Sequence, residues 1–314
     1  RMDHGGLFGN VGGSSKINIT GVGIGIGKRL KWPDDYFTIQ HELSYNYYDI
    51  SNGGMFFAIN NGYGNMFAYR VALSRNSISD FIYPRGGSRV TLSFKTTPMY
   101  SLFDGIDDYS DFTQAELFKY IEMFKTKFTG EYYFPLTRDK KLVLMNRFGF
   151  AFMGAYSANK GVSPMERYYM GGSGLTGIGM MDGREIVALR GYDDQPGPHI
   201  SSAQGDPIAA KFTMELRYPI SLNPSATFFL LGFAEAGNTY RLAREFDAFN
   251  VKRSAGVGVR IFLPMFGMLG LDYGWGFDML DPHSQGYATH NQQIMNRGYR
   301  GQFHFTIGMN LGEL

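Results

Sequence analysis

The sequence predicts an all-β fold, an antiparallel transmembrane β-barrel, and three observations lead to this prediction. Apolar and polar residues alternate with a period of two over many segments, each about as long as a tilted strand that crosses a bilayer. Aromatic residues are abundant, with 27 Phe and 21 Tyr, as in the girdles of barrels. No run of about 18 apolar residues could form a helical span. A chain that crosses a bilayer without helices must do so as a closed sheet.

The strands are expected in order along the chain. The clearest is the segment from Phe37 to Tyr48, where ring-bearing or aliphatic residues alternate with polar ones without a break. Similar runs begin near Val90, Ala210, Leu269 and Phe303. Eleven strands are expected, centred near residues 22, 42, 69, 93, 128, 147, 213, 231, 258, 273 and 307. An odd count indicates that further strands precede the first residue, because single-chain bacterial barrels have even numbers.

The connections between these strands differ in length. Short turns at 137–140 and 263–267 alternate with long segments at 51–62, 98–119, 158–207 and 279–301. Short turns on one rim and long loops on the other are typical of outer-membrane barrels.

The alternation also predicts which side chains meet lipid. One strand carries Lys211, Thr213, Glu215 and Arg217 at alternate positions, and four successive polar side chains on one face need water. The opposite face is then expected to meet lipid. The residues expected to face lipid include Phe37, Leu43, Val90, Leu92, Phe212 and Leu216.

Several functional classes find little support in the sequence. The formal net charge of +2 gives no electrostatic case for a nucleic-acid partner. The chain has no cysteine, which removes zinc-thiolate sites and thiol nucleophiles. Asp281, His283 and Ser284 are neighbours in one loop, and such neighbours rarely present the geometry of a catalytic triad. We therefore expect no enzyme activity, no catalytic residue, no metal and no cofactor.

The long segment 158–207 carries two motifs in a fixed order. The first is Glu166–Ser173, with an aromatic-x-Gly-Gly core, and the second is Ala188–Tyr192, an apolar-Arg-Gly-aromatic motif. This arrangement resembles the sixth extracellular loop of the BamA family. Further segments resemble that family in the same order: Tyr83–Ser88, Met214–Leu216, Phe233–Asn238, Ser254–Arg260 and Phe303–Leu311. Glu235 stands where the family usually has Asp.

The resemblance covers nearly the whole chain and implies a domain organisation. Residues 1–314 would be the C-terminal portion of one sixteen-stranded barrel, holding about its last eleven strands, with 158–207 as a plug-like loop. The POTRA domains and the first strands of the family would be absent. The family's proposed lateral gate lies between the first and last strands, so this chain would supply one side of it.

The same resemblance implies a function. The chain would belong to an insertase of the bacterial cell outer membrane that folds and inserts other outer-membrane proteins. Its partners would be unfolded outer-membrane protein clients, the lipoproteins of the BAM complex and the lipid bilayer. Two alternatives stay open, a passive outer-membrane channel and a barrel that anchors an absent enzyme domain.

Arg190 is the first candidate site residue, within the motif Leu189, Arg190, Gly191 and Tyr192. A guanidinium folded into a barrel lumen must find carboxylates, which it can bind bidentately. Glu215 lies on a polar face, whereas Glu235 shares the parity of Phe229, Leu231 and Phe233 and faces the lumen only if the loop packs on those rings. Gly191 would permit a tight turn, and Tyr192 would pack on the wall. This cluster would either hold a plug or take part in function.

The last strand supplies the second candidate site. Its expected gate residues are Phe303, Phe305, Ile307, Gly308 and Leu311. One interpretation is an ordinary closing strand. The other is an edge that opens and offers unpaired backbone groups to an incoming strand.

Overall fold

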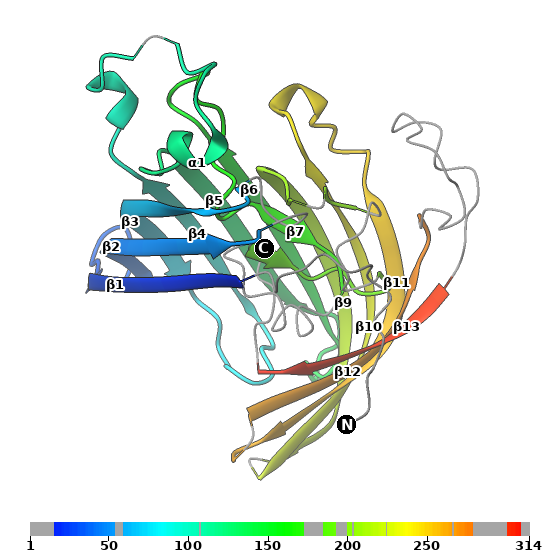
Figure 1. The fold of residues 1–314 in the computed structure, drawn as a ribbon. Helices are drawn as coiled ribbons and strands as arrows, with labels where there is room; N and C mark the ends of the chain where they lie inside the picture. Colours follow the sequence, from blue (N-terminus) through cyan, green and yellow to red (C-terminus); the bar gives the residue numbers. More distant parts are fainter. Residues whose placement is uncertain are drawn as a thin grey trace, which may run out of the picture.

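A computed structural model describes residues 16–53, 59–106, 108–172, 185–192, 200–202, 204–223, 225–265, 267–278 and 300–308. Eleven strands form one antiparallel sheet, which curves around a concave inner side (Figure 1). Among the described residues the sheet does not close, and β1 and β13 are its edges. The strands in sheet order are β1 (Lys16–Arg29), β2 (Phe37–Ser51), β3 (Gly62–Asn76), β4 (Gly87–Thr96), β5 (Phe124–Pro135), β6 (Val143–Gly154), β9 (Ile208–Asn223), β10 (Ala226–Tyr240), β11 (Lys252–Leu263), β12 (Gly267–Gly276) and β13 (Arg300–Ile307).

The predicted fold is confirmed at the level of single strands. Each of the eleven predicted centres lies within one of the eleven observed strands, and every strand pairs antiparallel with the next strand of the sheet. The long connections are also where the alternation predicted them, between β2 and β3, β4 and β5, β6 and β9, and β12 and β13. Strands that follow one another in the sheet pair across short and long connections alike, as in an up-and-down antiparallel arrangement.

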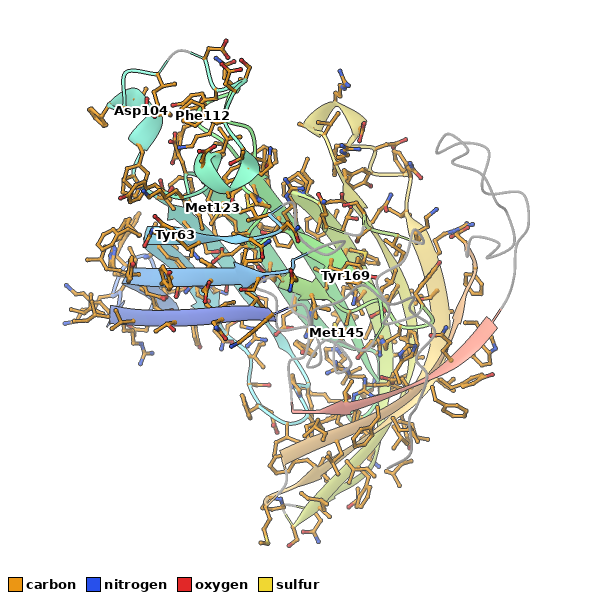
Figure 2. All side chains as sticks on the ribbon, viewed as in Figure 1. Tyr63, Asp104, Phe112, Met123, Met145 and Tyr169 are labelled. Carbon is orange, nitrogen blue, oxygen red and sulfur yellow. The ribbon has the colours of Figure 1, made fainter. Side chains whose placement is uncertain are left out.

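The long connections hold the remaining elements. Between β4 and β5 lie η1 (Tyr100–Leu102) and α1 (Gln114–Leu117), and Figure 2 shows Asp104 and Phe112 of this connection beyond the end of the sheet. The loop between β6 and β9 contains a parallel pair, β7 (Tyr168–Met170) and β8 (Glu185–Val187), and η3 (Ala243–Glu245) follows β10. These elements were not predicted, because they are too short for a periodic pattern. In the described part of the chain, no helix is long and apolar enough to cross a membrane.

The two faces of the sheet differ as the alternation predicted. Leu43, Leu92, Phe212 and Leu216 have between 42% and 49% of their surface exposed on the outer side. On β9, inward-facing polar side chains such as Thr213 are buried. Exposed apolar side chains on a continuous sheet face suit contact with lipid. Val90 is also exposed, while Phe37 is half-buried because the Arg75 guanidinium lies 5.9 Å from its ring.

The inner side is filled at one end by a folded turn. Tyr83, between β3 and β4, is buried, and its hydroxyl donates to the carbonyls of Lys141 and Arg217 at 2.7 and 3.0 Å. Its ring meets the Phe229 ring edge-on, with 5.2 Å between centroids. A buried tyrosine needs both apolar contact and a hydrogen-bond partner, and the Tyr83 side chain has both here. The segment Tyr83–Ser88 thus packs against the wall of the sheet.

Candidate functional site

The loop between β6 and β9 reaches the inner wall through small residues. Tyr168, Val187 and Leu189 are completely buried and pack in one cluster with Ala151 of β6 and Ala209 of β9. These two alanines are directly paired across the strands. Their short side chains leave room for the loop on the concave side, where β7 lies near β9 and β10 (Figure 1). The packing fixes the positions of the residues that follow Leu189.

Arg190 lies within hydrogen-bonding distance of both carboxylates proposed for it. Its Nη2 donates to Oε1 of Glu215 at 2.7 Å and to Oε1 of Glu235 at 2.8 Å. Glu235 also accepts from Nε at 3.1 Å and from the Arg190 backbone N–H at 2.9 Å. A third carboxylate, Asp272 of β12, has its Oδ1 3.6 Å from Nη1. The guanidinium is buried, with 8% of the side chain exposed, and it joins β9, β10 and β12.

An aromatic ring forms the floor of this site. The Arg190 Cζ lies 3.7 Å from the centroid of Phe233, which is buried on the same face of β10 as Glu235. A guanidinium that covers an aromatic face gains a cation–π interaction, and the ring excludes water from the charges. The shared parity of Phe233 and Glu235 therefore reflects one surface on which the loop packs. On that surface the ring of Phe233 and the carboxylate of Glu235 both contact Arg190.

Each carboxylate also contacts a cation from the wall. Arg217 donates to Glu215 at 2.6 Å, Lys211 lies 3.1 Å from Glu235, and Arg260 donates to Asp272 at 2.8 Å. Burial would lower the pKa of the Arg190 guanidinium, but Glu235, Glu215 and Asp272 outweigh it and raise this pKa above its ordinary value. The loop arginine therefore stays charged, as part of a buried network in which every carboxylate has at least two cationic neighbours.

Gly191 allows the loop to touch the wall backbone directly. Its φ is +89°, and a Cβ there would lie 2.8 Å from the backbone N of Gly276. A Cβ on Gly274 would in turn lie 2.8 Å from the Gly191 backbone N. Glycines on both partners are thus needed for this close approach. The next residue, Tyr192, is buried, and its hydroxyl donates to the Arg253 carbonyl at 2.8 Å.

The last described strand is connected to the loop motif through a histidine. The Gly191 backbone N–H donates to Nε2 of His304, 2.7 Å away, and His304 is 2% exposed on the inner face of β13. His304 was not among the predicted site residues, nor was Asp272, which pairs with it across β12 and β13. Both lie at inward positions of their strands. The alternation could have shown their direction, but not their contact with the loop.

The predicted gate residues lie along β13. Phe303, Phe305 and Ile307 have 74%, 49% and 49% of their surface exposed and point away from His304. Gly308 follows the strand with φ +95°, and its N–H donates to the Met268 carbonyl at 2.7 Å. Leu311 lies outside the described residues. Three outward apolar side chains and a backbone turn therefore mark this edge of the sheet.

A second charge cluster holds the loop and was not predicted. Glu166 lies 2.5 Å from the amine of Lys95, and Glu185 lies 2.9 Å from that of Lys125 and also contacts Lys127. The loop thus contributes carboxylates to one part of the wall and a guanidinium to another. Sequence alternation places the lysines inward but does not indicate which loop residues reach them.

Comparisons with known proteins agree with this fold. The sequence matches the Omp85 superfamily domain over residues 9–310. No curated protein matches the chain. Among solved structures, the crystal structure of BamA from Haemophilus ducreyi lacking POTRA domains 1–3 is similar, with a TM-score of 0.60 and 18% identity. The alignment covers 93% of this chain and 54% of that chain, so the chain spans about half the length of this relative.

Proposed function

This chain belongs to the Omp85 superfamily, and on that premise we propose that it forms part of an outer-membrane β-barrel insertase. In this proposal it folds and inserts other outer-membrane proteins through a lateral gate that includes β13. The full protein would be a sixteen-stranded barrel with POTRA domains, in the bacterial outer membrane. Its partners would be unfolded outer-membrane protein clients, BAM-complex lipoproteins and the lipid bilayer.

The observation that carries this proposal is the attachment of one loop motif to both the wall and the last strand. Arg190 contacts three carboxylates on β9, β10 and β12, and the adjacent Gly191 donates to His304 of β13. A gate strand must be held in register and yet remain able to part from its neighbour. Pairing with β12 holds β13 in register, and the single bond from Gly191 attaches it to the fixed loop, so its other edge can part from a neighbouring strand.

The edge of β13 supplies the chemistry that insertion needs. Among the described strands β13 pairs with β12 alone. An unpaired strand edge offers N–H and C=O groups to an incoming strand, and β-strand addition supplies its affinity through the main chain. Phe303, Phe305 and Ile307 would then present an apolar surface to lipid beside the new strand. Client recognition through the backbone suits substrates of many sequences.

The direct test is insertion by the purified full-length protein in lipid vesicles. Unfolded client barrels are added, and their folded fraction is followed over time by heat-modifiable migration in gels. Vesicles that carry the protein should fold clients faster than empty vesicles. Equal rates in the two preparations would refute insertase activity.

A passive channel is the second candidate, and the loop argues against a wide one. Leu189, Arg190 and Tyr192 are buried against the inner wall, so the loop occupies space that a porin would leave to water. Single-channel conductance separates the two functions, because a passive channel gives steady large openings in the absence of clients. The sequence of the full-length protein would show whether the barrel anchors an enzyme domain.

A further inference from the structure

The inner face of β3, β4 and β5 carries a row of cations. Arg70 pairs directly with Lys95, and Lys95 pairs directly with Lys125 across the three strands. Lys127 follows at the next inward position of β5. Like charges that face each other across strands are destabilising. This part of the wall therefore needs anions beside it.

The loop supplies two of these anions. Glu166 and Glu185 contact Lys95, Lys125 and Lys127, as described above. Glu166 has a φ of +60°, in the left-handed region that non-glycine residues seldom adopt. A backbone strained at that position is maintained by the contacts of its side chain. The loop glutamates thus neutralise one end of the row.

The other end of the wall has fewer carboxylates than cations. Arg89, Glu131 and Arg147 are direct neighbours across β4, β5 and β6. Both guanidiniums share the one carboxylate, at 2.8 and 2.9 Å. Their side chains remain 34% and 26% exposed, so both arginines are partly open to solvent. A guanidinium has five N–H donors, and a single shared carboxylate cannot satisfy two such groups.

A pocket of about 440 Å³ lies between these two ends. It is lined by Arg70, Arg89, Lys127 and Arg147, by the carboxylate of Glu131, and by the hydroxyls of Ser74 and Thr91. Across this wall six cations, Arg70, Arg89, Lys95, Lys125, Lys127 and Arg147, contact four carboxylates, Glu42, Glu131, Glu166 and Glu185, in the described part of the chain. Among these contacts the cations outnumber the carboxylates by two, and the four cations that line the pocket keep between 24% and 40% of their side chains exposed.

We propose that this pocket is a binding site for an oxyanion, either a carboxylate or a phosphate. Arginine donors arranged around a wet cavity match both groups through paired hydrogen bonds. The hydroxyls of Ser74 and Thr91 share one hydrogen bond of 2.9 Å, so one of the two protons can be donated to the same ligand. The anion has two sources, free inorganic phosphate or a carboxylate of an extended peptide in the lumen. The site is distinct from the Arg190 cluster and does not depend on insertase activity.

Calorimetric titration of the full-length protein in detergent micelles tests this site. The buffer is of low ionic strength, because salt screens exposed charges. Three ligands are compared: inorganic phosphate, a short peptide with a free C-terminal carboxylate, and the same peptide with an amidated C-terminus. The variants are Arg89→Gln, which leaves Glu131 paired with Arg147, and Lys127→Gln, which leaves Glu185 paired with Lys125. Lys141→Gln, in the exposed turn after β5, is the matched control.

We expect phosphate, the free-acid peptide or both to bind the unmodified protein and the control. Loss of one cation should weaken binding by about fivefold to tenfold, since one charge contact in wet surroundings contributes on the order of 1 kcal/mol. Binding of phosphate alone assigns the site to a free anion, and a preference for the free-acid peptide over its amide assigns it to peptide carboxylates. The proposal would be overturned if neither phosphate nor the free-acid peptide bound to the protein. It would also be overturned if Arg89→Gln and Lys127→Gln bound these ligands with the same affinity as Lys141→Gln.

Discussion

The backbone N–H of Gly191 donates to Nε2 of His304 at 2.7 Å, which places the long loop and the last described strand in direct contact. Both groups are buried. A buried N–H without an acceptor costs about 1 to 3 kcal/mol. Movement of either the loop or β13 away from the other would therefore be opposed by the loss of this bond. Any displacement of β13 must break this bond or move the loop with it.

Replacement of His304 tests this coupling. His304→Leu removes the acceptor, whereas His304→Gln keeps an acceptor oxygen at the end of a side chain of similar length. We expect His304→Leu to increase amide hydrogen exchange over residues 188–192 by about tenfold, as a loss of about 1.4 kcal/mol implies. His304→Gln should exchange nearly as slowly as the unmodified protein. If the leucine variant exchanged as slowly as the unmodified protein, the bond would have no energetic role.

Gly191→Ala tests the close approach of loop and wall. Alanine at φ +89° is strained, and its Cβ would also press on the β12 backbone. Gly161→Ala is the matched control, because Gly161 has φ +76° in the same loop but open space around a Cβ. The strain alone costs about 1 to 2 kcal/mol in each variant. Urea unfolding in vesicles should therefore show a larger loss of stability for Gly191→Ala, and equal losses would exclude a role for the contact.

Leu92→Arg tests the lipid-facing side of the sheet. Leu92 is 49% exposed on the outer face of β4, and an arginine there should cost about 2 to 4 kcal/mol if the site lies at the bilayer midplane. Thr91→Arg, one residue before, points to the wet inner face opposite the uncharged Ser74 and Thr129 and should cost much less. The two variants are compared by urea unfolding in vesicles. A similar cost for both would mean that the faces are assigned wrongly.

The sequence predicted most of the sheet because a period of two survives in every strand. Alternation placed Glu215 on the polar face of its strand, and it could have placed Asp272 in the same way. It could not decide the direction of Glu235, because buried rings such as Phe233 share its face and only loop packing explains them. Nor could it find His304, whose partner is more than a hundred residues away in the chain. Such contacts depend on where the loop lies, which has no periodic signal.

Loop charges escaped sequence reasoning for the same reason. Glu166 and Glu185 belong to a segment without regular alternation, and their partners Lys95 and Lys125 are on strands far away in sequence. Among the charged residues of the loop, only Arg190 was proposed as a site residue. The structure shows instead that the loop is held at two places, by charges of opposite sign.

Arg190→Ala tests whether this attachment serves function. Without Arg190, Glu215 still contacts Arg217, Glu235 still contacts Lys211, and Asp272 still contacts Arg260. The cost should therefore lie below the about 3 to 5 kcal/mol typical of a broken buried pair. The outer apolar face is unchanged, so the variant barrel should still insert while its loop loses the main attachment to the wall. We expect assembly of other barrels to decline more than the variant's own folding.

The measurement follows both quantities in the same cells. The unmodified protein is depleted, the variant is expressed, and folded levels of client barrels are compared with the variant's own heat-modifiable migration. Arg75→Ala is the control, because Arg75 forms a half-exposed pair with Asp34 at a distance from the loop. A folded variant with normal client levels would mean that Arg190 only holds the loop. If the variant itself failed to fold, Arg190→Lys, which keeps the charge but not the bidentate contact, would separate the structural role of the charge from the functional role of the guanidinium.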